Sequence, residues 1–491
     1  MPLHSRADSG APYQSLPSED DANTSLLRRS LDLDDEDALA EELVSQDVHS
    51  SGDARIRWIY FVLGAAVLLP WNVIITATPF FLSRLEGTSL KGTFSSYLSM
   101  SFTISNFAFL AHATVSADQS TNTRNVFLSI AALTLLTFLF TVSTFIQGPA
   151  GLFFAFVILN GVFQAAAGSY LQTSVISVAS LFGPTALQAM MAGQAAVGVA
   201  VSAVQVVSAA SSVRGEPIPG VVVVESNPEE RSAFAFFALS TAFLVLSAGA
   251  HAWLTRLPSY KAVVGQFSQI QHVARGDAGA MEVDPAQVAP PPQANAEKRD
   301  QIARVAKSNL IYNLGVAYVF IATLAVFPPI TISIQPTNPS THPLLFSAVH
   351  FLVFNVGDFA GRYAISFPRL HIWSSRRLLV LSLARTLFIP IFLMCNVQRG
   401  SSATSSSAII SSDVLYMLIL LVFGLSNGYV SSMTLIAAAS VEHNPYLKTR
   451  VEDVDVTATV ASFFLIGGLV VGSFASFGVR AAVCDCNPFY S

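Results

Sequence analysis

The sequence has little charge. Of its 491 residues, 12% are Asp, Glu, Lys or Arg, about half the share in an average soluble domain. From Asn125 through Val213 no Asp, Glu, Lys, Arg or His occurs at all, and 52% of the chain is hydrophobic. A surface that faces water cannot be built from such a stretch. This composition argues against a soluble enzyme and a nucleic-acid-binding protein, and it indicates a helical protein that crosses a membrane several times.

Cysteine and catalytic patterns are also scarce. The three cysteines are Cys395, Cys484 and Cys486, too few for a secreted disulfide scaffold. The C-x-C pair has no further Cys or His nearby to complete a metal site. Because no paired histidines, phosphate-binding glycine loop or nucleophile–base pattern is present, we expect no metal, no cofactor and no enzymatic activity.

The first segment of the chain is rich in acidic residues. Residues 1–57 hold 13 acidic and 5 basic side chains, which predicts a disordered acidic tail. Within it, Glu19-Asp20-Asp21 followed by Leu26-Leu27 approximates an acidic dileucine sorting signal, whose carboxylate-to-leucine spacing is one residue too long. A plasma-membrane location and a vacuolar or endolysosomal location therefore both stay open.

Hydrophobic stretches long enough to cross a bilayer recur along the rest of the chain. A membrane helix needs about 20 apolar residues, and eleven such spans are predicted. Their expected ranges are 58–81, 93–115, 126–146, 151–172, 186–210, 232–254, 308–334, 343–365, 376–396, 412–438 and 455–480.

A long polar loop divides these spans into six and five. Residues 255–307 contain three consecutive prolines and read as a flexible cytoplasmic linker. It separates a first bundle (58–254) from a second bundle (308–480), which a short tail (481–491) follows. With the N-terminus inside, the loops after residue 57 carry 13 Lys and Arg on the cytoplasmic side and 6 on the other side. This asymmetry predicts a cytoplasmic N-terminus.

Three ionisable residues lie well inside predicted spans, where such groups are costly and usually functional. Asp358 and Arg362 are four residues apart on one helix and can pair, and Asn355 lies one turn earlier. The three side chains suit a neutral ligand with several hydroxyls, although the pair could instead serve helix packing alone. Arg385 could equally be a structural partner for a carboxylate or a helix end.

Polar and aromatic residues mark other spans. Trp71 follows Pro70 deep in the first span and offers a ring face for stacking. Gln164 in the fourth span either joins helices or contacts a ligand. Phe327 precedes two prolines that predict a kink late in the seventh span.

Two runs resemble the signature motifs of the equilibrative nucleoside transporter family. They are Gly64-x-x-x-Leu68-Leu69-Pro70-Trp71-Asn72 and Phe354-Asn355-x-x-Asp358-x-x-Gly361-Arg362, and further agreement comes from Gly193-Gln194, Phe327-Pro328 and Ser426-Asn427-Gly428-Tyr429. The resemblance covers about residues 55–480. It implies an architecture related to the major facilitator fold, and movement of nucleosides, sometimes nucleobases, by alternating access. Transport in the family is facilitated diffusion or, in some members, coupled to protons.

The resemblance also implies roles for individual residues. Leu68 and Trp71 would line the base end of the pocket, and Phe327 would add an aromatic wall. Asp358 and Arg362 would bind the ribose hydroxyls or gate the site, with Asn355 in support. The base-recognising glutamine of the family falls nearer Ala167, so either Gln164 replaces it from the adjacent turn or base selectivity differs.

Two other functions compete with nucleoside transport. A carrier for another small polar solute would share the architecture and differ in its ligand. An intramembrane aspartyl protease would need a second intramembrane carboxylate beside Asp358, but Asp413 and Asp455 sit at span ends.

Overall fold

The computed structural model describes residues 54–214, 228–274, 292–338, 341–397 and 409–484. Helices make up the regular structure of these residues, with two isolated β-bridges besides. The predicted acidic tail lies outside the described residues except for the four that begin the first helix, and residues 485–491 of the C-terminal tail lie outside them as well. The helices are α2 (Ala54–Thr76), α3 (Thr78–Arg84), α4 (Phe94–Ser116), α5 (Gln119–Ser143), α6 (Ala150–Leu181), α7 (Gly183–Arg214), α8 (Pro228–Leu254), α9 (Pro258–Ala274), α10 (Pro292–Ser308), α11 (Leu310–Val326), α12 (Pro343–Ala364), α13 (Ser375–Ala384), α14 (Phe388–Leu393), α15 (Asp413–Ala438) and α16 (Val454–Cys484), with short 3₁₀ helices η1 (Thr331–Ser333), η2 (Pro368–Leu370), η3 (Arg385–Leu387) and η4 (Val451–Asp453).

Nine helical segments among the described residues are long and apolar enough to cross a membrane. The remaining two expected spans, 93–115 and 376–396, correspond to α4 and to the consecutive helices α13, η3 and α14. The second of these is interrupted because Pro390 cannot donate a backbone hydrogen bond and crowds the carbonyl four residues earlier. The structure is thus all-helical, as predicted, and consistent with eleven spans.

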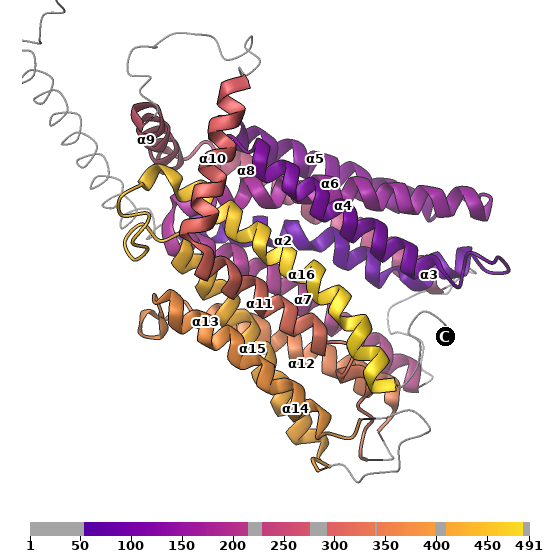
Figure 1. The fold of residues 1–491 in the computed structure, drawn as a ribbon. Coiled ribbons are helices and arrows are strands. Elements are labelled where there is room, and N and C mark those ends of the chain that lie inside the picture. Colours follow the sequence, from indigo (N-terminus) through magenta and orange to yellow (C-terminus); the bar gives the residue numbers. More distant parts are fainter. Residues whose placement is uncertain (1–53, 215–227, 275–291, 339–340, 398–408, 485–491) are drawn as a thin grey trace, which may run out of the picture.

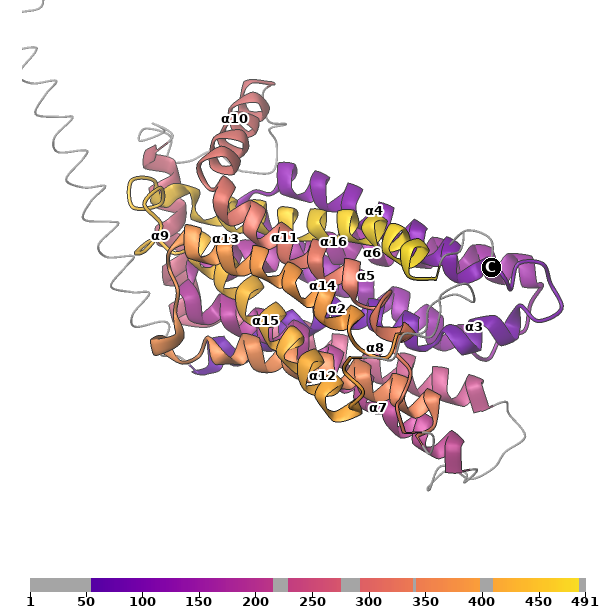
Figure 2. The same cartoon turned by 60° about the horizontal axis from the view of Figure 1, so that its bottom comes forward.

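The long helices run side by side, and α9 and α10 lie at one end of the bundle (Figures 1 and 2). We call this end the linker end and the opposite end the far end. We call α2–α8 the first half and α11–α16 the second half. Figure 1 shows the helices of the two halves diverging toward the far end.

The hydrophobic cores explain this divergence. One large buried cluster joins both halves, with Phe182 and Met190 from the first half and Met433 and Val454 from the second. A second cluster contains residues of the first half alone, and a third contains residues of the second half alone. Apolar burial is the main favourable term in packing. The halves therefore share one apolar core, and each half also has an apolar core of its own.

Glycines bring the backbones of α12 and α15 into direct contact. A Cβ on Gly428 would lie 1.9 Å from the carbonyl oxygen of Asp358, and one on Gly361 would lie 2.1 Å from that of Leu425. Only glycine permits such an approach between membrane helices. In the first half, Gly64 and Gly193 bring α2 and α7 equally close.

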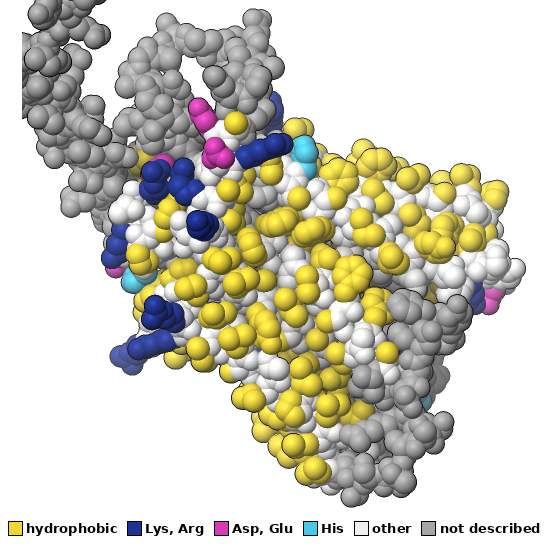
Figure 3. All heavy atoms as spheres, in the orientation of Figure 1, with side chains coloured by type: hydrophobic (Ala, Val, Ile, Leu, Met, Phe, Trp, Pro, Cys, Tyr) yellow, Lys and Arg dark blue, Asp and Glu magenta, His cyan; other side chains and the backbone are white. Residues whose placement is uncertain are grey.

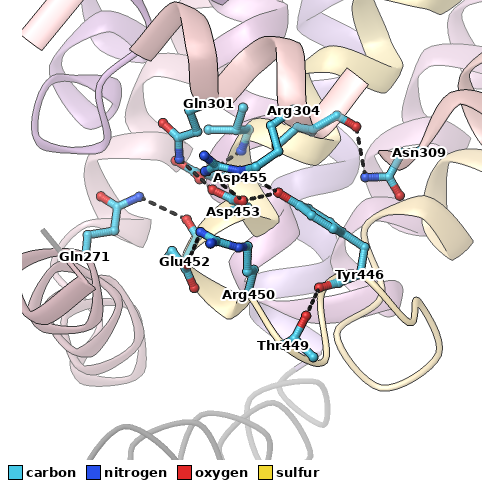
Figure 4. Close-up of polar contacts among 12 residues, drawn as sticks. Gln271, Gln301, Arg304, Asn309, Tyr446, Thr449, Arg450, Glu452, Asp453 and Asp455 are labelled. Atoms are coloured by element: carbon cyan, nitrogen blue, oxygen red, sulfur yellow. Dashed lines mark hydrogen bonds and ion pairs between the residues drawn. The ribbon is translucent and has the colours of Figure 1, made fainter. Parts of the chain in front are cut away.

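The helix α10 docks on the start of α16 through a buried carboxylate (Figure 4). Asp453 is fully buried and accepts a hydrogen bond from Gln301 Nε2 at 2.6 Å and one from the Tyr446 hydroxyl. Arg304 Nη2 lies 3.5 Å from its Oδ2. Burial raises the pKa of Tyr446, so this hydroxyl stays a donor at neutral pH. The range predicted as a linker therefore contains a helix fixed to the second half.

The helix α9 is fixed to the first half instead. The Tyr260 hydroxyl lies 2.8 Å from Thr123 Oγ1, and its ring stacks on Phe182. The side chain of Gln271, near the other end of α9, donates to the backbone oxygen of Glu452 at 3.5 Å (Figure 4). Consequently α9 belongs to one half and touches the other at the linker end.

The side of the bundle seen in Figure 3 is largely apolar, and most basic residues on it gather at the linker end. Leu152, Leu239 and Val414 are each at least 70% exposed. A broad apolar surface of this kind is unfavourable in water and suits contact with lipid. The chain is a multi-pass membrane protein.

Candidate functional site

Asp358 and Arg362 form an ion pair inside the second half. Arg362 Nε donates to Asp358 Oδ2 at 2.9 Å, and each residue is 6% exposed. Both residues lie on the last turns of α12, where the four-residue spacing places them on one face. The pairing predicted from the sequence is present.

The other oxygen of this carboxylate is bound from α15. Asn427 Nδ2 donates to Asp358 Oδ1 at 2.6 Å. Thr323 of α11 in turn donates to Asn427 Oδ1 at 2.7 Å. The glycine contacts between α12 and α15 hold Asn427 within reach of Asp358.

Arg385 belongs to the same hydrogen-bond network, at the end opposite Asp358. Its guanidinium donates to Thr323 Oγ1 at 2.8 Å and to Asn427 Oδ1 at 3.4 Å. It also donates to the carbonyl of Phe423 at 3.1 Å and to the Ser426 hydroxyl, and it lies over the Phe423 ring. Arg385 is 1% exposed, so these contacts hold a charge that is removed from solvent.

Arg362 also crosses to the first half. Its Nη1 donates to the carbonyl of Met191 on α7 at 3.2 Å, and Gln188 on the same helix donates to the carbonyl of Arg362. The ion pair therefore lies where α12 meets α7. A movement of one half against the other must change these bonds.

Asn355 takes part in a different contact between the halves. Its Nδ2 donates to Ser202 Oγ of α7 at 2.6 Å and to the carbonyl of Phe351 at 3.0 Å. A Cβ on Gly198 would lie 2.7 Å from Asn355 Oδ1, so a larger residue at that position would displace the Asn355 amide. The described bonds of Asn355 lead to α7 and not to the ion pair that it was expected to support.

Phe327 lies in an aromatic cluster of the second half. The helix α11 ends at Val326, two residues before Pro328, so the helix is interrupted where a kink was predicted. The Phe327 ring stacks on that of Phe354, with the centroids 4.1 Å apart. Because Phe354 lies one turn before Asp358, an aromatic wall stands beside the charged network.

The candidate residues of the first half have partners in that half. Trp71 is half-buried and stacks on Phe102 of α4, with the ring centroids 4.0 Å apart. Leu68 is also half-buried, and its carbonyl accepts a hydrogen bond from Asn72. Pro70 removes one backbone donor from this turn of α2.

Gln164 is buried with half of its amide unused. Its Nε2 donates to Asn160 Oδ1 at 2.8 Å, and Asn160 donates to the carbonyl of Leu136 on α5. Gln164 is 2% exposed, and its Oε1 has no hydrogen-bond partner. A buried acceptor without a donor is costly unless a ligand or water supplies one.

Sequence reasoning identified the ion pair but missed most of its partners. Asn427, Thr323 and Gln188 carry no charge, and amides and hydroxyls occur in many membrane helices. The available signal was Asn427 next to Gly428 in a run with Gly424, a pattern of close helix contact. Among the described residues, no group of three His, Cys, Asp or Glu side chains could hold a metal ion.

The fold and the buried polar contacts between the halves define a class, a multi-pass helical membrane protein with a polar site inside the bundle. The family model described as Nucleoside transporter matches residues 157–481. This match covers more than half of the chain. The chain belongs to the nucleoside transporter family, which is a family of transporters and not of enzymes.

Curated relatives match most of the chain. Equilibrative nucleoside transporter 1 of Mus musculus is 24% identical and that of Homo sapiens is 23% identical, each over 87% of this chain and 96% of the relative. Equilibrative nucleoside transporter 3 of Rattus norvegicus is 25% identical over 84% of this chain and 86% of its own length. The family resemblance predicted from the motifs is confirmed.

A solved structure also shows similarity. It is the major facilitator superfamily transporter FucP in the outward conformation, which is 14% identical, with a TM-score of 0.48 over 89% of this chain and 94% of FucP.

Proposed function

We propose that this chain carries nucleosides across a membrane by alternating access, with the ribose held by Asp358. The observation that carries this proposal is the buried ion pair of Asp358 and Arg362 at the contact between α12 and α7. An ionised carboxylate has about four lone-pair sites, and Asn427 and Arg362 occupy two of them. The remaining sites suit the two neighbouring hydroxyls of a ribose.

The base is assigned to the aromatic and amide groups on both sides. Trp71 and Phe327 offer ring faces, Leu68 offers an apolar edge, and Gln164 offers an unpaired amide oxygen. Base–aromatic stacking tolerates different bases, whereas an amide distinguishes their hydrogen-bonding edges. Asn355 is assigned to the contact between halves beside the ligand, through Ser202.

The unequal joining of the halves supports alternating access. The shared core joins them around the linker end, and separate clusters hold each half elsewhere. We assign the linker end to the cytoplasm because the basic loops gather there (Figure 3). The structure then corresponds to a state that is closed toward the cytoplasm, with the N-terminus on the cytoplasmic side.

Uptake of radiolabelled uridine and adenosine by transporter-deficient cells, or by proteoliposomes, tests the proposal. Saturable uptake is expected for the wild type, and Asp358→Asn should raise the KM by weakening the bonds to the ribose. Asp413→Asn is a matched control, since Asp413, at the start of α15, accepts hydrogen bonds from the backbone amides of Thr337 and Asn338. Absence of uptake of every nucleoside by the folded wild-type protein would contradict the proposal.

Facilitated diffusion and proton coupling both remain within this mechanism. Uptake across pH 5.5 to 8, with and without an uncoupler, separates them, because coupled uptake collapses with the proton gradient. Microscopy of a tagged full-length chain distinguishes the plasma membrane from vacuolar or endolysosomal membranes.

A further inference from the structure

Arg385 joins the proposed ribose site through a chain of hydrogen bonds that runs in one direction. The chain passes from Arg385 Nη2 to Thr323 Oγ1 at 2.8 Å, and from Thr323 Oγ1 to Asn427 Oδ1 at 2.7 Å. It ends at Asp358, which Asn427 Nδ2 reaches at 2.6 Å. The four residues come from η3, α11, α15 and α12.

The residues at the two ends of this series of hydrogen bonds fix the direction of donation. A guanidinium has donors and no acceptor, whereas an ionised carboxylate has acceptors and no donor. The hydroxyl of Thr323 can act in either way, so it cannot orient Asn427 by itself. Because Arg385 donates to the Thr323 oxygen, the single Thr323 hydrogen points away from Arg385, toward Asn427 Oδ1 and the carbonyl four residues earlier, each 2.7 Å away. Arg385 Nη2 also lies 3.4 Å from Asn427 Oδ1, so both neighbours favour an acceptor on this side of the amide.

The orientation of the Asn427 amide follows from this. With Oδ1 toward Thr323 and Arg385, the amide nitrogen faces Asp358 and donates to it. With the amide turned over, its NH₂ group would face the donor-only guanidinium and its oxygen would face the carboxylate. A buried mismatch at both ends costs much more than one missing bond.

We propose that Arg385 is a positioning residue for nucleoside binding, which acts through Thr323 and Asn427 to hold Asp358 for the ribose hydroxyls. This inference rests on the proposed function, because Asp358 must touch the sugar. Arg385 itself is 1% exposed and enclosed by Phe423, Ser426 and Thr323. It therefore sets the affinity for hydroxyl-bearing sugars without contacting them.

The test compares uridine with 2′,3′-dideoxyuridine, which has the same base and lacks both hydroxyls. Thr323→Val removes the linking hydroxyl with little change of shape. Arg385→Lys keeps the charge but loses the planar fork, in which Nη1 binds the Phe423 carbonyl and thereby fixes Nη2 against Thr323. Each variant should raise the KM for uridine about three- to tenfold, the loss of one hydrogen bond. Inhibition by dideoxyuridine should be unchanged.

Thr434→Val on α15 is the matched control. Thr434 is fully buried and donates to the carbonyl four residues earlier, as Thr323 also does, but its hydroxyl bonds within α15. It should retain the wild-type preference for uridine. The amount of folded transporter, measured by size-exclusion chromatography of a fluorescent fusion, separates a loss of protein from a change in KM.

A double variant locates the effect. In an Asn427→Ala background, Arg385→Lys should cause no further loss of the preference for uridine, because the link to Asp358 is already broken. An additional loss of similar size would overturn the proposal. So would reduced amounts of Arg385→Lys and Thr323→Val proteins that keep the wild-type KM and preference, since a structural role alone has that result.

Asp358→Asn separates this inference from the function on which it depends. If Asp358→Asn loses the preference for uridine while Thr323→Val and Arg385→Lys retain it, the positioning role is wrong and the ribose site stands. If Asp358→Asn retains the preference, the ribose site itself is wrong.

Discussion

The two halves of the bundle hold their candidate site residues in different ways. In the second half, Asp358 and Arg362 belong to a network that spans four helical elements and reaches α7. In the first half, Trp71 stacks on a ring of a neighbouring helix, and Gln164 bonds to an amide of its own helix. The difference follows from charge, because a buried ion needs several partners whereas a neutral ring or amide needs one or two.

This contrast suggests a division of labour. A network held from several helices fixes the position of the carboxylate, which suits the sugar common to all nucleosides. Side chains held by one local contact can differ in size and polarity at lower cost, which suits the part of the ligand that varies. Substitutions in the second half should therefore affect all nucleosides, and those in the first half should change the ranking among bases.

The largest effect is expected from Arg362→Leu. It leaves the buried carboxylate of Asp358 without its cation, at a cost of about 3–5 kcal/mol. Folded protein and uptake of every nucleoside should be lost, as measured by thermal stability in detergent and by transport.

The double variant Asp358→Leu/Arg362→Leu tests whether the ion pair of the second half serves transport or only helix packing. It removes both charges, so much of the lost stability should return while uptake stays absent. If the double variant transports nucleosides like the wild type, the pair serves helix packing alone.

A smaller effect is expected from Trp71→Ala. Loss of a ring face that stacks on a base costs about 1–3 kcal/mol, which raises the KM for nucleosides without removing the folded protein. Trp71→Phe keeps a ring and should recover most of the affinity. An unchanged KM for Trp71→Ala would show that its contact with Phe102 is structural.

The smallest effect is expected from Gln164→Ala. It removes one amide whose oxygen lacks a partner, so the ratio of adenosine to uridine uptake should change about three- to tenfold. Stability should change little. Asn160→Ala also removes a bond to Gln164 but leaves Oε1 in place, so its adenosine-to-uridine ratio should stay closer to that of the wild type. Equal losses for both nucleosides would contradict a role in base selection.

Several features could be predicted because they depend on local composition or spacing. The low charge and apolar stretches predict a multi-span helical protein, and the all-helical structure confirms it. The four-residue spacing predicts the Asp358–Arg362 pair, since one helix carries both. The span interrupted at η3 shows the limit, because hydropathy does not register the break between α13 and α14.

Other features depend on residues far apart in the sequence. The partners of Asp358 on α15 and of Arg362 on α7 could not be derived from spacing, since they require knowing which helices touch. The helices α9 and α10 were expected to be part of a linker because their sequence is polar. Composition does not reveal that Tyr260 fixes α9 to the first half or that Asp453 fixes α10 to the second half. Arg385 was visible as an intramembrane charge, but its connection to Asp358 runs through Thr323 of α11 and Asn427 of α15.

The sequence by itself therefore determined that this protein lies in a lipid bilayer, and it determined the chemical groups of its site. Scarce charge requires lipid around the helices, and two motifs carry the carboxylate, the guanidinium and the aromatic rings. The tertiary structure alone decided how these groups act together. Glycine contacts bring α12 against α15, and α7 lies beside α12, so one carboxylate is held from several helices. Hydrogen bonds act over about 3 Å, and only the packing of distant segments brings their donors and acceptors that close.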